Sequence, residues 1–399
     1  MNIICNRDIL NSAVTPALSA VSNKGTVQAL DGFLLVADKT EGTLVICGYD
    51  LEKGVKVTVS GEGVQVNENG SIILNAAKFS SIIRNLPDGE VSVISDTNFA
   101  ASIKSGKSEF TLHGLDPDTF PLMPELAGEK NLKISRRILK NMVASTLFSV
   151  GVNNSRPVLN GALFEIKNNE MNVVTSDGNR MSLSRSFEGL NSSEELDLSF
   201  VIPGRSLSEL LKLIGDGEEP AEIELTQKHV IISFDNIIFF SRLIESEFLD
   251  YKRAMRIEPK TTVVVNTQSF LESVERAAIL TDDKQRTEIR LNFIKEINIE
   301  NKEEAGIVQI TSSGSLGKVN DECDIEIYGD DLLIAFNHRY LYEALRAVRE
   351  EKILIKLENA MKTLFILPYD EENKNNLENS MDTDGSKFIY LVMPTRMRD

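Results

Sequence analysis

Six segments of the chain carry apolar residues at steps of three and four, which is the spacing that predicts amphipathic helices. Three of them, 7–23, 135–150 and 268–280, begin about 130 residues apart. A second set recurs at nearly the same interval, at 76–86, 204–214 and 338–349. Each member of the second set follows a strand-like run, with Asn75, Pro203 or Asn337 where a helix is expected to begin. The same unit in the same order predicts an internal threefold repeat.

Between the helices, short alternating or apolar runs bounded by turn signals predict β-strands. These runs lie at 43–47, 55–59, 91–95, 162–166, 223–225, 263–265, 307–310 and 353–357. Successive strands joined by tight turns, such as the one at Asp177-Gly178, favour antiparallel pairing. We therefore expect an α+β fold of three repeated antiparallel domains with two helices each, at 1–128, 129–258 and 259–399. The acidic, turn-rich segment 369–387 is expected to form a long hairpin loop in the last domain.

The composition is that of a globular protein, with 42% hydrophobic and 26% charged residues. No apolar run approaches the length of a membrane-spanning helix, and the first residues do not resemble a secretory signal. We therefore expect a cytoplasmic protein without membrane contacts. Cys5, Cys47 and Cys323 are widely separated and form no C-x-x-C pair, so they predict reduced thiols rather than disulfides or a zinc site.

The formal net charge of -17 argues at first against nucleic acid, because phosphate binding needs Lys and Arg. The predicted helices, however, carry more basic than acidic residues, so the remainder of the chain is strongly acidic. Two interpretations stay open from the residues alone. The helices form a positive surface that faces DNA, or they carry solvated charge on their outer faces, as amphipathic helices generally do.

Little in the sequence supports catalysis. The three histidines, His113, His229 and His338, have no metal-ligand spacing, and the chain lacks G-x-S-x-G, P-loop and G-x-G-x-x-G motifs. A hydrolase or transferase would need a nucleophile beside a base, and we find no such set. We expect a non-enzymatic protein without metal or cofactor. A purely structural scaffold, which would show no dependence on DNA, is the competing hypothesis.

Strings spread over nearly the whole chain resemble the family of bacterial DNA sliding clamps, the beta subunits of DNA polymerase III. They are 48–52 (GYDLE), 120–124 (FPLMP), 159–165 (LNGALFE), 176–181 (SDGNRM), 248–253 (FLDYKR), 276–280 (RAAIL) and 390–397 (YLVMPTRM). Their order and spacing, together with the threefold repeat, make the resemblance specific. The chain departs from the usual residues of the family at Gln28, Leu249 and Thr395.

The resemblance implies the DNA clamp fold, with the helices lining the hole of a ring around double-stranded DNA and the sheets outside. It implies that the ring is a head-to-tail homodimer, since three repeats per chain give six domains from two copies. The two-domain clamps of archaea and eukaryotes need three copies instead. Phosphate contacts are expected from Lys24, Arg137, Lys140 and Arg205, and the dimer interface from Phe110, Leu112, Ile279 and Leu280.

The resemblance also implies a peptide-binding groove between the second and third domains. There the alpha subunit of DNA polymerase III, the clamp loader, other polymerases and repair factors would insert a short motif. The expected residues are Arg156, Leu159, Ser176, Gly178, Asn179, Arg180, Met181, Leu249, Arg253, Ala254, Thr363, Leu391, Val392, Met393, Pro394, Thr395, Arg396 and Met397. Of these, Leu159, Leu391, Val392 and Met393 are expected to form an apolar floor, and Arg156, Arg180 and Arg396 to orient the peptide. The turn at Asp177-Gly178 is, from the residues alone, simply a hairpin turn. The apolar 388–394 run predicts a buried strand before the C-terminal tail.

Overall fold

The computed structural model describes residues 1–22, 27–124, 130–191, 196–217, 219–280, 288–296, 305–315, 317–369 and 387–397. Lys24 and most of the expected 369–387 loop lie outside the described residues. Backbone contacts divide the chain into two compact units. Unit 1 is Met1–Lys140, Gly189–Glu194 and Arg205–Leu243, and unit 2 is Asn141–Glu188, Glu195–Gly204 and Ile244–Asp399.

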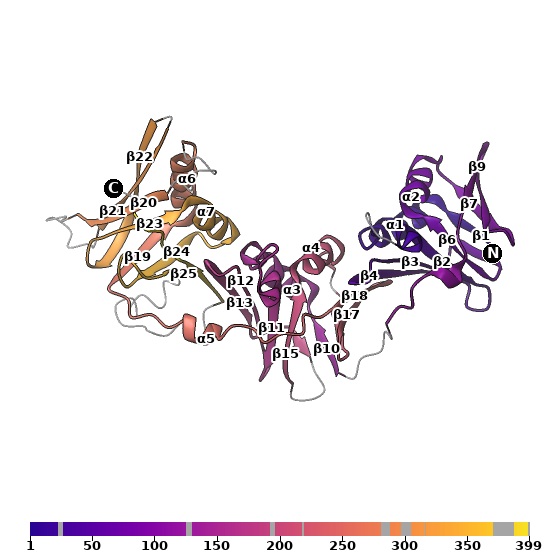
Figure 1. The fold of residues 1–399 in the computed structure, drawn as a ribbon, viewed down its shortest axis with the longest axis horizontal. Coiled ribbons are helices and arrows are strands. Elements are labelled where there is room, and N and C mark those ends of the chain that lie inside the picture. The colour runs from indigo at the N-terminus through magenta and orange to yellow at the C-terminus, as the bar shows by residue number, and fades with distance from the viewer. Residues whose placement is uncertain are drawn as a thin grey trace. The chain divides into compact units, whose positions relative to one another are not determined.

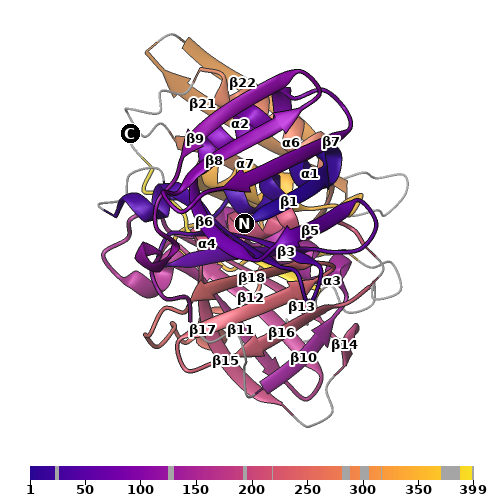
Figure 2. The same ribbon diagram turned by 90° about the vertical axis from the view of Figure 1, so that its right-hand side faces the viewer.

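The first repeat lies in unit 1. Its elements are β1 (Asn2–Asn6), α1 (Arg7–Leu18), β2 (Gly32–Asp38), β3 (Thr43–Tyr49), β4 (Lys53–Val59), β5 (Val64–Glu68), β6 (Gly70–Asn75), α2 (Ala76–Asn85), β7 (Glu90–Ser95), β8 (Ala100–Ser105) and β9 (Ser108–His113). Asn6 and Asn75 cap the two helices by accepting bonds from the amides of Asp8 and Lys78. The helices lie side by side and bury Leu10 and Phe79 (Figure 1). The strand order β5-β1-β7-β8-β9 leaves β9 at a sheet edge (Figure 2).

The second repeat has the same succession of elements. They are β10 (Lys130–Ile134), α3 (Arg136–Ala144), β11 (Gly161–Lys167), β12 (Glu170–Ser176), β13 (Arg180–Ser186), β14 (Leu190–Asn191), β15 (Asp197–Pro203), α4 (Gly204–Leu213), β16 (Ala221–Leu225), β17 (His229–Phe234) and β18 (Ile237–Arg242). Short 3-10 helices precede β2 and β11, at η1 (Gln28–Asp31) and η4 (Pro157–Asn160), and two more lie at η2 (Pro117–Thr119) and η3 (Leu147–Ser149).

The third repeat lies in unit 2, after the short helix α5 (Tyr251–Ala254). Its elements are β19 (Thr261–Asn266), α6 (Thr267–Ala278), β20 (Glu288–Lys295), β21 (Ala305–Gly314), β22 (Gly317–Gly329), β23 (Leu332–Asn337), α7 (His338–Ala347), β24 (Lys352–Leu357), β25 (Leu364–Pro368) and β26 (Phe388–Val392). Its core is apolar and includes Phe270, Phe293 and Phe336, all fully buried. The expected C-terminal strand is confirmed, because every residue of β26 is buried.

Sheets continue from one repeat into the next, which explains why the second repeat is divided between the units. In unit 1 the nine-stranded sheet runs β14-β10-β16-β17-β18-β4-β3-β2-β6, so β18 joins β4. In unit 2 the twelve-stranded sheet runs β15-β11-β12-β13-β26-β25-β24-β19-β22-β21-β20-β23, so β13 joins β26. We call β4–β18 the first junction and β13–β26 the second junction. All ladders in these sheets are antiparallel, and the expected repeated α+β fold is confirmed.

The helices that the apolar pattern predicts are present but shorter than expected. The first ends at Leu18 rather than at residue 23, and α3 ends at Ala144 rather than at residue 150. After α3, the hydroxyl of Thr146 bonds to the carbonyl of Met142, and the chain tightens into η3. The pattern also missed the full length of β22, whose first residues are polar and alternate between intermediate and exposed positions.

Candidate partner-peptide site

The second junction brings the expected groove residues from distant parts of the chain into one region of unit 2. Antiparallel pairing places Arg180 opposite Val392 and Met181 opposite Leu391. Leu159, Met181 and Leu391 share one apolar cluster with Tyr251 and Phe365. Val392 packs instead into the core of the third repeat, and Met393 is 49% exposed. The expected floor is therefore divided, because adjacent strand residues face opposite sides of the sheet.

The turn between β12 and β13 is held by its own side chains. Asp177 Oδ1 accepts bonds from the amides of Asn179, at 2.8 Å, and Arg180, at 3.1 Å. The hydroxyl of Ser176 donates to the carbonyl of Arg180 at 2.8 Å. Gly178 adopts a φ of 94°, which a glycine reaches without steric cost. The carbonyl of Asn179 accepts the amide of Met393 at 2.9 Å, so the turn also fixes the residue after β26.

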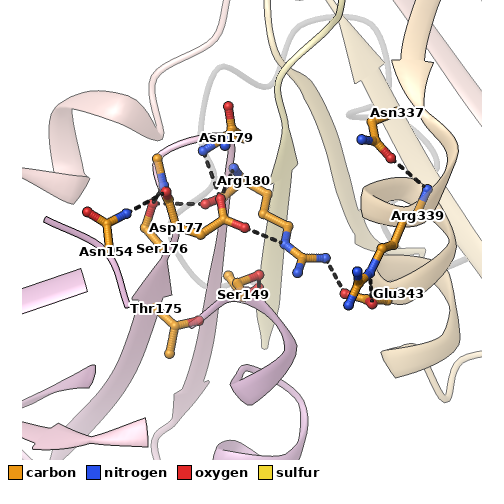
Figure 3. A network of polar contacts seen from close by, with 12 residues as sticks. Ser149, Asn154, Thr175, Ser176, Asp177, Asn179, Arg180, Asn337, Arg339 and Glu343 are labelled. Atoms are coloured by element: carbon orange, nitrogen blue, oxygen red, sulfur yellow. Dashed lines mark hydrogen bonds and ion pairs between the residues drawn. The ribbon is translucent and has the colours of Figure 1, made fainter. Parts of the chain in front are cut away.

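Arg180 lies at the centre of an ion-pair network that links this turn to helix α7 (Figure 3). Its side chain is only 7% exposed; Nε donates to Asp177 Oδ2 at 3.0 Å and Nη1 to Glu343 Oε2 at 2.6 Å. The guanidinium carbon also lies 4.8 Å from the ring centre of Tyr340. Arg180 therefore does not fit the expected role of a cation that awaits a peptide, because its charge is already compensated by two carboxylates.

Glu343, which accepts the hydrogen bond from Arg180, was not among the residues expected from the sequence. Its second oxygen accepts a bond from Arg339 Nε at 2.8 Å. Burial by itself would raise the pKa of Glu343, but hydrogen bonds from Arg339 and Arg180, and their charges, lower this pKa below its ordinary value. The carboxylate is thus held in its ionised form between two guanidinium groups.

The segment before the third repeat is fixed against β11. The hydroxyl of Tyr251 donates to Glu165 Oε2 at 2.5 Å, and Lys252 pairs with the same carboxylate at 3.0 Å. Asp250 caps α5 by accepting the amide of Arg253. Leu249 packs against the Leu159–Leu391 cluster while Arg253 and Ala254 are exposed.

The other expected groove residues lie at or near the surface of unit 2. Arg156 and Arg396 are exposed, and Thr363, Pro394 and Thr395 are half-buried. Met397 is exposed as well. The amide of Thr395 donates to the carbonyl of Ala335 at 2.8 Å, so the tail after β26 is bonded to β23.

The expected phosphate-binding residues that the structure describes are Arg137, Lys140 and Arg205, all in unit 1. Arg137 and Arg205 are exposed on α3 and α4. Lys140 is half-buried and pairs with Asp216 at 2.9 Å. By contrast the neighbouring Arg136 is buried and bonded to Asp235 and to the carbonyl of Glu219, so it serves the fold.

The expected dimer residues include apolar side chains on the surface. Phe110 is 41% exposed on the edge strand β9, where Leu112 is half-buried. Ile279 is 72% exposed just after α6. Leu280 follows it and lies against Gly314 and Gly317, at the tip of the β21–β22 hairpin.

Comparison with known proteins identifies the family. Models of the N-terminal, central and C-terminal domains of the DNA polymerase III beta subunit match residues 1–124, 133–250 and 252–382. The beta sliding clamp of Halalkalibacterium halodurans is 31% identical over 94% of this chain and 98% of its own length. That of Bacillus subtilis is 30% identical over 99% and 100%.

The chain belongs to the bacterial DNA polymerase III beta subunit family, the beta sliding clamps. A crystal structure of the DNA polymerase sliding clamp from Bacillus subtilis has a TM-score of 0.90 at 27% identity, with all of both chains covered. The sliding clamp from Pseudomonas aeruginosa bound to griselimycin has a TM-score of 0.87 at 25% identity. The resemblance stated from the sequence is confirmed, and the names of these relatives agree with a clamp rather than an enzyme.

The remaining sequence expectations concern metal, membrane and thiols. Within the described ranges, no group of three His, Cys, Asp or Glu side chains is arranged to hold a metal ion, and no helix is long and apolar enough to cross a membrane. All three cysteines are buried with free thiols. Burial raises the pKa of Cys5 to about 11 and that of Cys47 to about 12, which keeps them protonated and unreactive.

Tyr340 and Glu343 are the site residues that sequence reasoning missed. Glu343 is 163 residues from Arg180 in sequence, and it lies in a different repeat. The available signal was the Arg339 and Glu343 pair at i and i+4, but this spacing is ordinary for an exposed helix face.

Proposed function

We propose that two copies of this chain close head to tail into a ring around double-stranded DNA. The ring would tether the replicative DNA polymerase in the cytoplasm and confer processivity. The proposal includes the division of each chain into three clamp domains, at residues 1–128, 129–258 and 259–399. The positive helices would face the DNA, and phosphate contacts without base contacts would let the ring slide.

The observation that carries the proposal is the equivalence of the two junctions. At the first junction β4, which follows the β3–β4 turn, pairs with β18, the last strand of the second repeat. At the second junction β13, which follows the β12–β13 turn, pairs with β26, the last strand of the third repeat. The equivalent strand of the third repeat is β22. Within the described residues, β22 pairs with β21 along its length, but with β19 only through residues 326–329, so the edge at 317–325 is unpaired.

The last strand of the first repeat, β9, is likewise a sheet edge. Exposed edges of this kind are templates for pairing with another chain. If β22 of one copy pairs with β9 of the other, the junction seen twice within the chain is repeated between copies. Unlike surfaces then meet, and the assembly closes after two subunits. Phe110 and Ile279 lie next to these edges, where they would be buried.

Retention on DNA tests the ring. The protein loaded on closed circular DNA should remain bound and should dissociate after the circle is linearised. Equal retention on both forms would exclude a topological link. Replacing Lys24, Arg137, Lys140 and Arg205 with Glu should reduce retention, whereas Lys167→Glu, an exposed residue on β11 that pairs with Asp197, should not.

Light scattering tests the dimer. The wild type should show about twice the chain mass of 44.3 kDa. Ile279→Asp should give the monomer, because it would place a charge in an apolar contact, and Met361→Asp, in an exposed loop, should leave the mass unchanged. A monomeric wild type at micromolar concentration would reject the ring.

The second part of the proposal is that the second junction binds short apolar motifs of the DNA polymerase III alpha subunit, the clamp loader and other partners. The exposed Met393 and Met397, which follow β26 in the chain, suit such a contact, and Leu391 of β26 belongs to the Leu159–Leu391 cluster. A fluorescein-labelled peptide ending in Leu-Phe should bind the wild type by fluorescence anisotropy. It should not bind a variant that lacks residues 393–399. Light scattering should show that this variant still forms a dimer. Equal binding to both would place the site elsewhere.

A further inference from the structure

Arg180 is a nearly buried cation whose two carboxylate partners come from different repeats. Asp177 belongs to the turn that contains Arg180, and Glu343 belongs to α7 in the third repeat. The rings of Phe148 in η3 and Tyr340 in α7 also face the guanidinium. Their centres lie 5.4 and 4.8 Å from the guanidinium carbon. The contact with Asp177 is local, so Glu343 provides the charged connection between the turn and the helix (Figure 3).

The first junction shows what the same scaffold does without this connection. Lys53 occupies the place of Arg180, since it follows an Asp-x-x turn and begins the strand that joins the next repeat. Its ammonium group pairs with Asp50 of its own turn at 2.6 Å. The sixth residue of α4, Glu209, corresponds to Glu343, the sixth residue of α7. Glu209 pairs with Lys212 on its own helix at 3.0 Å. Among the described residues, Lys53 and Glu209 therefore do not form the pair from turn to helix that Arg180 and Glu343 form.

The turn that Glu343 anchors is also the part of the site that holds the end of β26. The carbonyl of Asn179 accepts the amide of Met393, and Arg180 pairs with Val392 in the ladder. A displacement of Arg180 toward or away from α7 would therefore move the end of β26, from Leu391 of the apolar cluster to Met393. Packed elements transmit such shifts because interiors are dense.

We propose that Glu343 is a positioning residue of the partner-peptide site, acting through Arg180 to hold the β12–β13 turn and Met393 in the arrangement that accepts an apolar peptide. This proposal rests on the proposed peptide-binding function. It also assigns Arg180 to the framework, so that recognition of partner acids is left to exposed cations such as Arg156 and Arg396.

The test compares Glu343→Gln with the matched variant Glu209→Gln in the full-length chain. The probe is the labelled peptide ending in Leu-Phe, measured by fluorescence anisotropy. Glu343→Gln should weaken binding about tenfold, within the range that coupled neighbouring residues show, and Glu209→Gln should bind as the wild type does. Both variants should keep the dimer mass. Equal affinity of Glu343→Gln and wild type overturns the inference but leaves the peptide site standing, whereas no binding by the wild type removes both.

A double-mutant cycle separates positioning from a general loss of packing. Arg180→Gln and the double variant Arg180→Gln/Glu343→Gln are measured with the same peptide. If Glu343 acts through Arg180, the double variant should bind no more weakly than Arg180→Gln alone. Additive losses in affinity would show that Glu343 influences the peptide by another route and would overturn the proposal.

Discussion

The first and second junctions have the same backbone arrangement but different side chains. Each is an antiparallel strand pair that follows a turn in which an aspartate binds a basic residue three positions later, Asp50 with Lys53 and Asp177 with Arg180. The registers correspond: Gly54 lies opposite Phe240 in the first junction, and Met181 lies opposite Leu391 in the second.

The first junction is closed by aromatic packing. Phe240 is fully buried, its ring centre lies 5.5 Å from that of Tyr49, and Tyr49 also contacts Phe120 of the segment that leads to the second repeat. Gly54 is required by this packing, because a Cβ added there would meet the Phe240 ring at 2.1 Å. The chain thus fills this junction with its own residues.

At the position equivalent to Gly54 and Phe240 the second junction has Met181 opposite Leu391, beside the Arg180 network. Its aromatic residues, Phe388 and Tyr390 of β26, pack into the core of the third repeat instead. A fully satisfied buried polar network rigidifies the elements that it joins. The same scaffold thus has a tight aromatic contact at Gly54 and Phe240, whereas the equivalent Met181 and Leu391 belong to the apolar cluster of the proposed peptide site. The predictions below change one junction at a time.

The largest effect is expected from Phe240→Ala at the first junction. Truncation of a fully buried phenylalanine costs about 3–5 kcal/mol through lost burial and the cavity that remains. Urea denaturation should show this loss, while the affinity for the Leu-Phe peptide should stay within error because Phe240 lies in unit 1. A stability change below about 1 kcal/mol would contradict the view of the first junction as an aromatic joint.

A smaller effect is expected from Arg180→Met, at about 2–4 kcal/mol, since it leaves Asp177 and Glu343 without their shared cation. The matched variant Lys53→Met removes a single pair within one turn and should cost about 1 kcal/mol. Calorimetric unfolding of both variants and the wild type measures the two losses of stability. Equal costs would mean that the link to α7 contributes nothing to stability.

Gly54→Ala should destabilise the first junction by about 1–3 kcal/mol, because the added methyl group overlaps the Phe240 ring. The loss should shrink in Gly54→Ala/Phe240→Leu, which replaces the ring with a leucine, as at Leu391 of the second junction. Urea midpoints give the cost of Gly54→Ala in two backgrounds, the wild type and Phe240→Leu. A smaller cost in the Phe240→Leu background would show that the overlap with the Phe240 ring causes the loss of stability. An unchanged loss in the double variant would point to backbone strain instead.

One strand of each junction follows from the sequence, since the runs at 55–59 and 388–394 predict β4 and β26. Their partners β18 and β13 are not among the predicted strands. Where the predictions succeed, the determinants are local. Asn75 and Asn337 mark helix starts since their side chains accept bonds from nearby helix amides. The apolar run at 388–392 predicts a buried strand since a run of that kind is stable only when covered. The turn at Asp177 follows from Gly178 in the same way.

The differences between the junctions do not follow from local signals. The partner of Arg180 lies on α7, and the partner of Gly54 lies on β18, so both depend on contacts between repeats. The helix ends were overestimated for a related reason. The apolar residues after Ala144 continue the helical spacing, but Phe148 among them is used by η3 to pack against Tyr390. Periodicity identifies which residues are buried and not which element buries them.

The smallest expected effect is the pH dependence of the second junction. The pKa of Glu343 is lowered in the folded protein, so its contribution to stability is fully present above its unfolded pKa and is lost as the pH falls through the folded pKa. The groups that bond to its carboxylate are the guanidinium groups of Arg180 and Arg339, so the pH dependence is assigned to Glu343 in these two ion pairs. At neutral pH the wild type should exceed Glu343→Gln in thermal midpoint, and the gap should close in acid as the carboxylate is protonated. Glu209→Gln, the matched variant in α4, should show a smaller gap at neutral pH, because its pair with Lys212 is solvated and worth less than about 1 kcal/mol. A gap for Glu343→Gln that persists undiminished below the folded pKa would show that the side chain acts through packing and not through its charge.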